Sequence, residues 1–74
     1  SVTASINIDA KVAEQVTVKV YDMVGRQCYN QQFTMVEGEN VFNLDFSSVN
    51  MAQGMYSVQI RGVETAKTVM LMVK

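Results

Sequence analysis

The chain has 74 residues, of which 49% are hydrophobic, and its formal net charge is −1. This length allows one domain, residues 1–74, with a thin core, and the hydrophobic content is too high for a disordered segment. The basic residues are scattered and the charge is close to neutral, which argues against binding of nucleic acid or of an anionic membrane.

The sequence carries few residues that support catalysis. It has no histidine and one cysteine, so the commonest general base is missing and neither an internal disulfide nor a cysteine-based zinc site can form. The four glycines are isolated and form no phosphate-binding loop. We therefore expect no enzyme, no cofactor, no metal and no small-molecule substrate. Cys28 is interpreted as a small half-buried hydrophobe, with an intermolecular disulfide or a reactive thiol as the alternative.

The sequence contains no run long enough to span a membrane as a helix and no N-terminal signal peptide. The longest wholly apolar run, residues 69–73, is far shorter than the roughly 20 residues of a membrane helix. The chain starts with Ser1 rather than Met, and no signal peptide follows. We expect a fragment or processed product of a larger protein.

Alternation of apolar and polar residues dominates the chain and predicts strands. The predicted strands cover residues 2–9, 16–21, 26–36, 41–46, 56–61 and 65–74. Gly25 and Gly38 mark tight turns between them, residues 47–53 form a longer loop, and no segment has helical spacing. Several short strands at regular spacing predict an all-β antiparallel sandwich of about six to seven strands.

Tyr56 follows the longer loop at the start of a late strand, with Gly54 two residues before it. In sandwiches a tyrosine at this place donates its hydroxyl to upstream backbone, and we interpret Tyr56 as such a corner. The simpler alternative is an aromatic residue that merely favours a strand. Gly25, Gly38, Gly54 and Tyr56 are the residues that we expect to set the fold.

The final strand has two apolar faces. Val69, Leu71 and Val73 alternate with Met70 and Met72, although a strand of a single sandwich needs only one apolar face. We expect Met70 and Met72, together with Met55, to be exposed or to make a contact, because methionine is common on surfaces that accept partners. The alternative is a bulge that redirects one of them into the core.

Four segments resemble the type IX secretion C-terminal sorting domain (type A). These are residues 18–26 (VKVYDMVGR), 38–47 (GENVFNLDFS), 51–60 (MAQGMYSVQI) and 65–74 (TAKTVMLMVK). One departure is the lack of proline, since family members usually begin with an Asn-Pro segment.

The resemblance implies an immunoglobulin-like β-sandwich at the C-terminus of a cargo protein. Such a domain directs its cargo from the periplasm across the Gram-negative outer membrane to the cell surface. A sortase-like peptidase then removes the domain. The implied partners are the outer-membrane translocon and the sortase-like components.

We expect recognition to lie in the last strand. The residues that we assign to recognition are Lys67, Thr68, Val69, Met70, Leu71, Met72, Val73 and Lys74. The same strand could pair with a second copy of itself and form a homodimer. The alternative function is an immunoglobulin-like structural or adhesive module that binds a partner protein or carbohydrate at the cell surface.

Overall fold

The computed structural model describes residues 3–74, which form six strands and contain no helix. The strands are β1 (Thr3–Ala10), β2 (Glu14–Tyr21), β3 (Gln27–Met35), β4 (Gly38–Asp45), β5 (Gly54–Arg61) and β6 (Ala66–Val73). All six predicted strands are present, with ends that differ by a few residues. Val2, which was predicted to open the first strand, lies outside the described residues.

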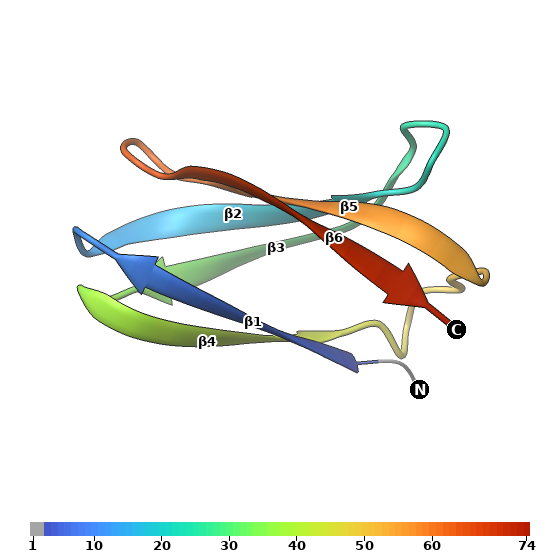
Figure 1. Ribbon diagram of the computed structural model, residues 1–74, viewed down its shortest axis with the longest axis horizontal. Helices are drawn as coiled ribbons and strands as arrows, with labels where there is room; N and C mark the ends of the chain where they lie inside the picture. The colour runs from blue at the N-terminus through green and yellow to red at the C-terminus, as the bar shows by residue number, and fades with distance from the viewer. Residues whose placement is uncertain (1–2) are drawn as a thin grey trace.

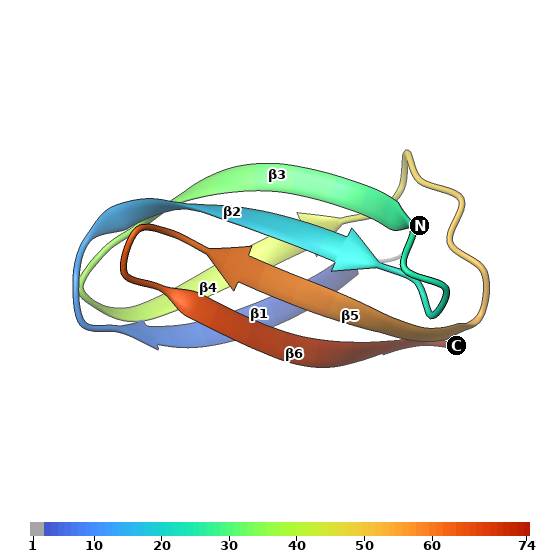
Figure 2. The same ribbon diagram turned by 90° about the horizontal axis from the view of Figure 1, so that it is seen from above.

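The strands form two antiparallel sheets that pack face to face. One sheet has the order β1-β4 and the other has the order β3-β2-β5-β6. Figure 2 shows the larger sheet lying over the smaller one. In an immunoglobulin sandwich, strands B and E are neighbours in one sheet, and strands C′, C, F and G follow this order in the other. The strands β1 and β4 correspond to the first pair, and β3, β2, β5 and β6 to the second set. The predicted all-β sandwich is confirmed.

Alternating side chains from both sheets meet in one core between them. Val16, Val18 and Val20 of β2 and Val58 and Ile60 of β5 are almost fully buried. The remaining large core residues are Ile6 and Ile8 of β1, Phe42 and Leu44 of β4, Phe46 just beyond β4, Met35 at the end of β3 and Tyr56 of β5. Burial of each such side chain contributes about 1.5–3 kcal/mol of transfer free energy.

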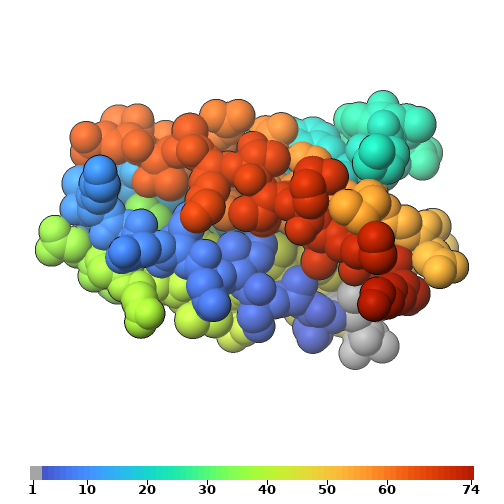
Figure 3. All heavy atoms as spheres, in the orientation of Figure 1, coloured from blue at the N-terminus to red at the C-terminus, as the bar shows by residue number. Residues whose placement is uncertain are grey.

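Two aromatic pairs hold β3 against β4. The ring of Phe33 stacks on that of Phe42 with centroids 4.7 Å apart, and Tyr29 meets Phe46 edge-on at 4.9 Å. Phe46 lies one residue beyond β4 and is still buried. These contacts close one long side of the sandwich, while β1 and β6 lie along the other (Figures 1 and 3).

The start of β1 and the C-terminus lie at the same end of the sandwich. Figure 1 shows the C-terminus, the start of β1 and the loop between β4 and β5 at the same end. The pairing agrees, since Gly54 at the start of β5 lies opposite Val73 at the end of β6. In residues 3–74 no helix is long and apolar enough to cross a membrane.

Candidate recognition surface

The last strand, β6, lies at the edge of the four-stranded sheet. It pairs antiparallel with β5 over its whole length, from Arg61 opposite Ala66 to Gly54 opposite Val73. Figure 3 shows the strand running along the surface of the molecule from the hairpin to the C-terminus. An edge strand has one row of backbone groups that is free to pair with another chain.

The two faces of β6 have different environments. Val69, Leu71 and Val73 point inward, where Val73 is buried and the other two are half-buried against the core. Met70 and Met72 point outward, and each is 56% exposed. The expectation that both methionines face solvent is therefore confirmed, and no bulge turns either of them inward.

The structure divides the assigned recognition residues into two groups. Thr68, Met70, Met72 and Lys74 are exposed, and Lys67 is exposed at the beginning of the strand. Val69, Leu71 and Val73 support the fold from inside. A partner that binds the folded domain can touch the first group, whereas the buried Val73 becomes accessible only if β6 separates from the sheet.

A carboxylate from another strand fixes the turn that leads into β6. Glu14 of β2 accepts hydrogen bonds from the Thr65 hydroxyl (2.6 Å) and from the backbone amides of Val63 (2.7 Å) and Glu64 (3.2 Å). The Thr65 hydroxyl, followed by these amides, lowers the pKa of Glu14 below its ordinary value of 4.5. A methyl group on Gly62 would lie 2.6 Å from the Glu14 carboxyl carbon, so the glycine leaves room for the carboxylate.

The opposite end of β6 lies beside the tyrosine corner. The Tyr56 hydroxyl donates a 2.6 Å hydrogen bond to the carbonyl of Ala52, as the corner interpretation predicted. Gly54, two residues before Tyr56, has a φ of 149°, which L side chains rarely adopt. The loop before β5 is thus tied to the start of the strand that pairs with β6.

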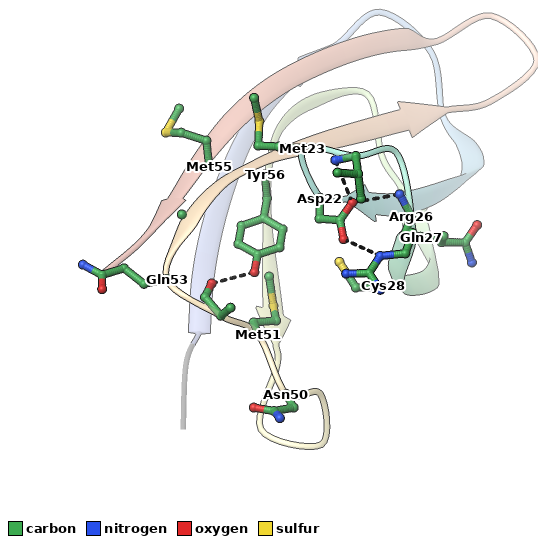
Figure 4. A pocket seen from close by; sticks show the side chains of 13 residues that line it. Asp22, Met23, Arg26, Gln27, Cys28, Asn50, Met51, Gln53, Met55 and Tyr56 are labelled. Atoms are coloured by element: carbon green, nitrogen blue, oxygen red, sulfur yellow. Dashed lines mark hydrogen bonds and ion pairs between the residues drawn. The ribbon is translucent and has the colours of Figure 1, made fainter.

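A hollow of about 500 Å³ separates this corner from the turn between β2 and β3 (Figure 4). On its turn side, the Asp22 carboxylate accepts hydrogen bonds from the Arg26 amide (2.9 Å), the Val24 amide (3.1 Å) and the Arg26 guanidinium (3.0 Å). The Arg26 amide is the main reason that the pKa of Asp22 is lowered. Gly25 completes the turn with a φ of 90°. The polar groups of the turn therefore satisfy one another.

Cys28 also lines the hollow and is half-buried. Burial, followed by the charge of Asp22, raises the pKa of its thiol, and the thiol donates to the Val20 carbonyl at 3.5 Å. A raised pKa keeps the thiol protonated, which favours the interpretation of a small hydrophobe. No group of three or more His, Cys, Asp or Glu residues that could hold a metal occurs among residues 3–74.

The sequence interpretation missed two residues that fix the fold. Asn40 is only 9% exposed. Its side-chain oxygen accepts a hydrogen bond from the Val36 amide (2.9 Å), and its side-chain NH₂ donates to the carbonyls of Val36 (2.8 Å) and Gly38 (3.0 Å). Its position was readable, because it shares the inward alternation of Phe42 and Leu44. The second residue, Glu14, gave no local signal, since its partner Thr65 lies 51 positions away.

Comparisons with known proteins identify the family. Residues 2–74 match the family model described as the secretion system C-terminal sorting domain. Comparison with curated proteins gave no match, and comparison with solved structures gave none. The match covers nearly the whole chain and agrees with the four segments that resemble the type IX domain. The chain therefore belongs to the family of secretion system C-terminal sorting domains, which act as sorting signals on cargo for the type IX secretion machinery.

Proposed function

We propose that the type IX machinery reads this domain through the outward side chains of β6, together with Lys67 at its start and Lys74 at its end. The observation that carries the proposal is the pair of methionines, each 56% exposed on a strand whose other face is anchored in the core. Exposed apolar side chains in a group usually mark a contact, and methionine adapts its shape to a partner. The family match favours this role over an adhesive module.

The inward face of β6 holds the strand in a fixed position, so its outward side chains are displayed in a defined arrangement. Val73 is buried opposite Gly54, and the Glu14 carboxylate holds the turn before Ala66. Both ends of β6 are therefore fixed, and the outward side chains keep a defined order along the sheet. A rigid strand loses little conformational entropy when a partner binds it.

The family match supports a wider role that we also propose. Residues 1–74 form a single sorting domain on a larger cargo protein, which passes through the periplasm and crosses the outer membrane. The cargo is secreted or displayed at the cell surface, as the family implies. A sortase-like component then removes the domain. The domain itself acts as a tag and has no catalytic role.

Export of a cargo fused to this domain tests the assignment to β6. In Met70→Ser with Met72→Ser, we expect the cargo to accumulate in the periplasm while the domain stays folded, because neither side chain is in the core. Val41→Ser is the matched control, since Val41 is 60% exposed on the other sheet. Normal surface display of the double variant would contradict the assignment.

The free edge of β6 also supports a homodimer in which two copies pair along this strand. Sedimentation of the chain over a concentration series tests it. A rise in mass with concentration is expected, and Thr68→Pro at the edge should suppress the rise if the partner pairs with the backbone there. A chain that stays monomeric at the highest concentration would contradict the homodimer.

A further inference from the structure

The outward face of the four-stranded sheet has one sign of charge. Lys19 of β2 and Arg61 of β5 point outward, and Lys74 continues the outward row of β6. Within strands β2, β3, β5 and β6, no outward position carries Asp or Glu. Glu14 begins β2, but its carboxylate is turned into the hairpin before β6.

The same face carries a connected apolar patch beside the cations. Met55 lies directly opposite Met72, and Ser57 lies between Tyr21 on one side and Met70 on the other. Neighbours of this kind on adjacent strands lie about 4.5–5.5 Å apart at Cβ, so the side chains form one surface across three strands. The apolar patch therefore includes Tyr21 of β2 and Met55 of β5 in addition to Met70 and Met72 of β6.

The outward face of the two-stranded sheet has the opposite charge. Asp9 of β1 lies directly opposite Glu39 of β4, and Asp45 lies opposite Thr3. All three acidic residues are exposed. Their separation from Lys19 and Arg61 gives the outward faces of the two sheets opposite charge, although the net charge of the chain is only −1. A field of this form orients the domain as it approaches a charged partner.

From this arrangement, and resting on the function proposed above, we infer that the outward face of the four-stranded sheet is a docking surface for a partner protein that presents carboxylates around an apolar patch. Lys19 and Arg61 provide the charge complementarity, and Tyr21 and Met55 enlarge the contact that Met70 and Met72 begin. The recognised surface is then a sheet face that spans β2, β5 and β6, rather than the last strand alone.

An anionic membrane is the less favoured occupant. A cation near an anionic surface contributes about 1 kcal/mol, and the acidic residues of the opposite sheet offset part of that attraction. Tyr21 and Met55 of the patch are half-buried, which suits contact with another protein surface better than insertion between lipids.

Photo-crosslinking in cells that export a cargo fused to the domain tests the docking surface. A benzophenone side chain at Gln59, in the middle of the outward face, should crosslink to an outer-membrane protein. The same probe at Val41, on the other sheet, should not. We expect the yield at Gln59 to fall when isolated membranes are raised from about 0.1 M to about 1 M salt, because the Debye length shortens from about 10 Å to about 3 Å.

Variants that change the surface charge provide a second test of the docking surface. Lys19→Gln with Arg61→Gln takes the net charge from −1 to −3, and the control pair Asn7→Glu with Asn43→Glu makes the same change on the other sheet. We expect the first pair to lower the crosslink yield and the export rate on the order of tenfold, the scale on which surface charge changes association. The control pair should leave both near wild type.

The results of these experiments distinguish failure of the docking surface from failure of the proposal that recognition lies in β6. If the Lys19 and Arg61 pair crosslinks and exports like wild type while Met70→Ser with Met72→Ser is retained, the docking surface is wrong and the β6 assignment stands. If every variant is exported normally, both are wrong. A probe at Gln59 that labels lipid alone, with flotation of the domain on vesicles of anionic lipid, would overturn the protein partner in favour of a membrane.

Discussion

The hydroxyl of Tyr56 donates a hydrogen bond to the backbone carbonyl of Ala52 across 2.6 Å, four residues upstream in the chain. Tyr56 is 6% exposed and belongs to the core, so the bond joins the loop before β5 to the packed interior. The loop and the corner also line the hollow that faces the turn between β2 and β3 (Figure 4).

Tyr56→Phe should lower the free energy of unfolding by about 0.5–1.5 kcal/mol, because it removes one hydrogen bond and keeps the buried ring. Urea denaturation followed by circular dichroism measures the change. Tyr21→Phe is the control, since Tyr21 is half-buried on the outward face and its hydroxyl makes no hydrogen bond to another described residue. Equal stability of Tyr56→Phe and wild type would mean that water replaces the bond without loss.

Asn40→Ala should lower the free energy of unfolding by about 1–3 kcal/mol, because the backbone groups of Val36 and Gly38 lose their buried partner. Asn43→Ala is the matched control on the same strand, with its side chain exposed. The loss should appear as a lower denaturation midpoint with an unchanged slope. A loss no larger than that of Asn43→Ala would show that Asn40 is dispensable for the turn.

The stability of the domain should depend on pH through Glu14. Its pKa in the folded state is lower than in the unfolded chain, so the unfolded chain binds more protons as pH falls. The contribution of Glu14 is present above the ordinary value of 4.5 and disappears as pH falls through the folded value. Asp22 and Asp45 also have lowered pKa values and act in the same direction.

Comparison with the Glu14→Gln variant isolates the part of the pH dependence of stability that is due to Glu14. The stability difference between wild type and this variant should be largest at neutral pH and should shrink as pH falls below 4.5. Denaturation at a series of pH values gives this difference directly. A stability difference that stays constant through the acidic range would contradict the proposed role of the Glu14 clamp, by which we mean the hydrogen bonds from Val63, Glu64 and Thr65 to the Glu14 carboxylate.

Gly62→Ala tests the same clamp by crowding. The added methyl group would press on the Glu14 carboxyl group, which must then leave the amides of Val63 and Glu64. We expect a clear loss of stability in wild type and a much smaller one in Glu14→Ala, where the space is free. A double-mutant cycle measures this coupling. Additive effects of the two changes would show that Gly62 and Glu14 act independently.

The alternation of side chains made most of the fold predictable from the sequence. Val16, Val18 and Val20 could be assigned to an inward face because one face of a sandwich strand must be buried, and the same rule assigned Met70 and Met72 to the outward face. The sheet order and the Glu14 clamp could not be read in this way. Both depend on how distant segments pack, and Glu14 and Thr65 are 51 positions apart.

The docking surface could not be predicted from the sequence either, because Tyr21, Met55 and Met70 become neighbours only through strand pairing. Local alternation fixes the face on which each residue lies, but the register between β2, β5 and β6 decides which residues meet. The segregation of Lys19 and Arg61 from Asp9 and Glu39 follows from the same pairing.

The outward methionines should matter for export but not for folding. Met70→Ser with Met72→Ser removes apolar side chains that are each 56% exposed, so the free energy of unfolding should change by less than about 0.5 kcal/mol per site. Val73→Ser is the contrasting change, because Val73 is buried against the core, and it should lower stability by about 1–3 kcal/mol. Denaturation of the isolated domain and export of the fused cargo are measured for both. Retention of a fully stable Met70 and Met72 variant in the periplasm would separate recognition from folding, whereas retention accompanied by unfolding would mean that these side chains serve the fold, contrary to their exposure.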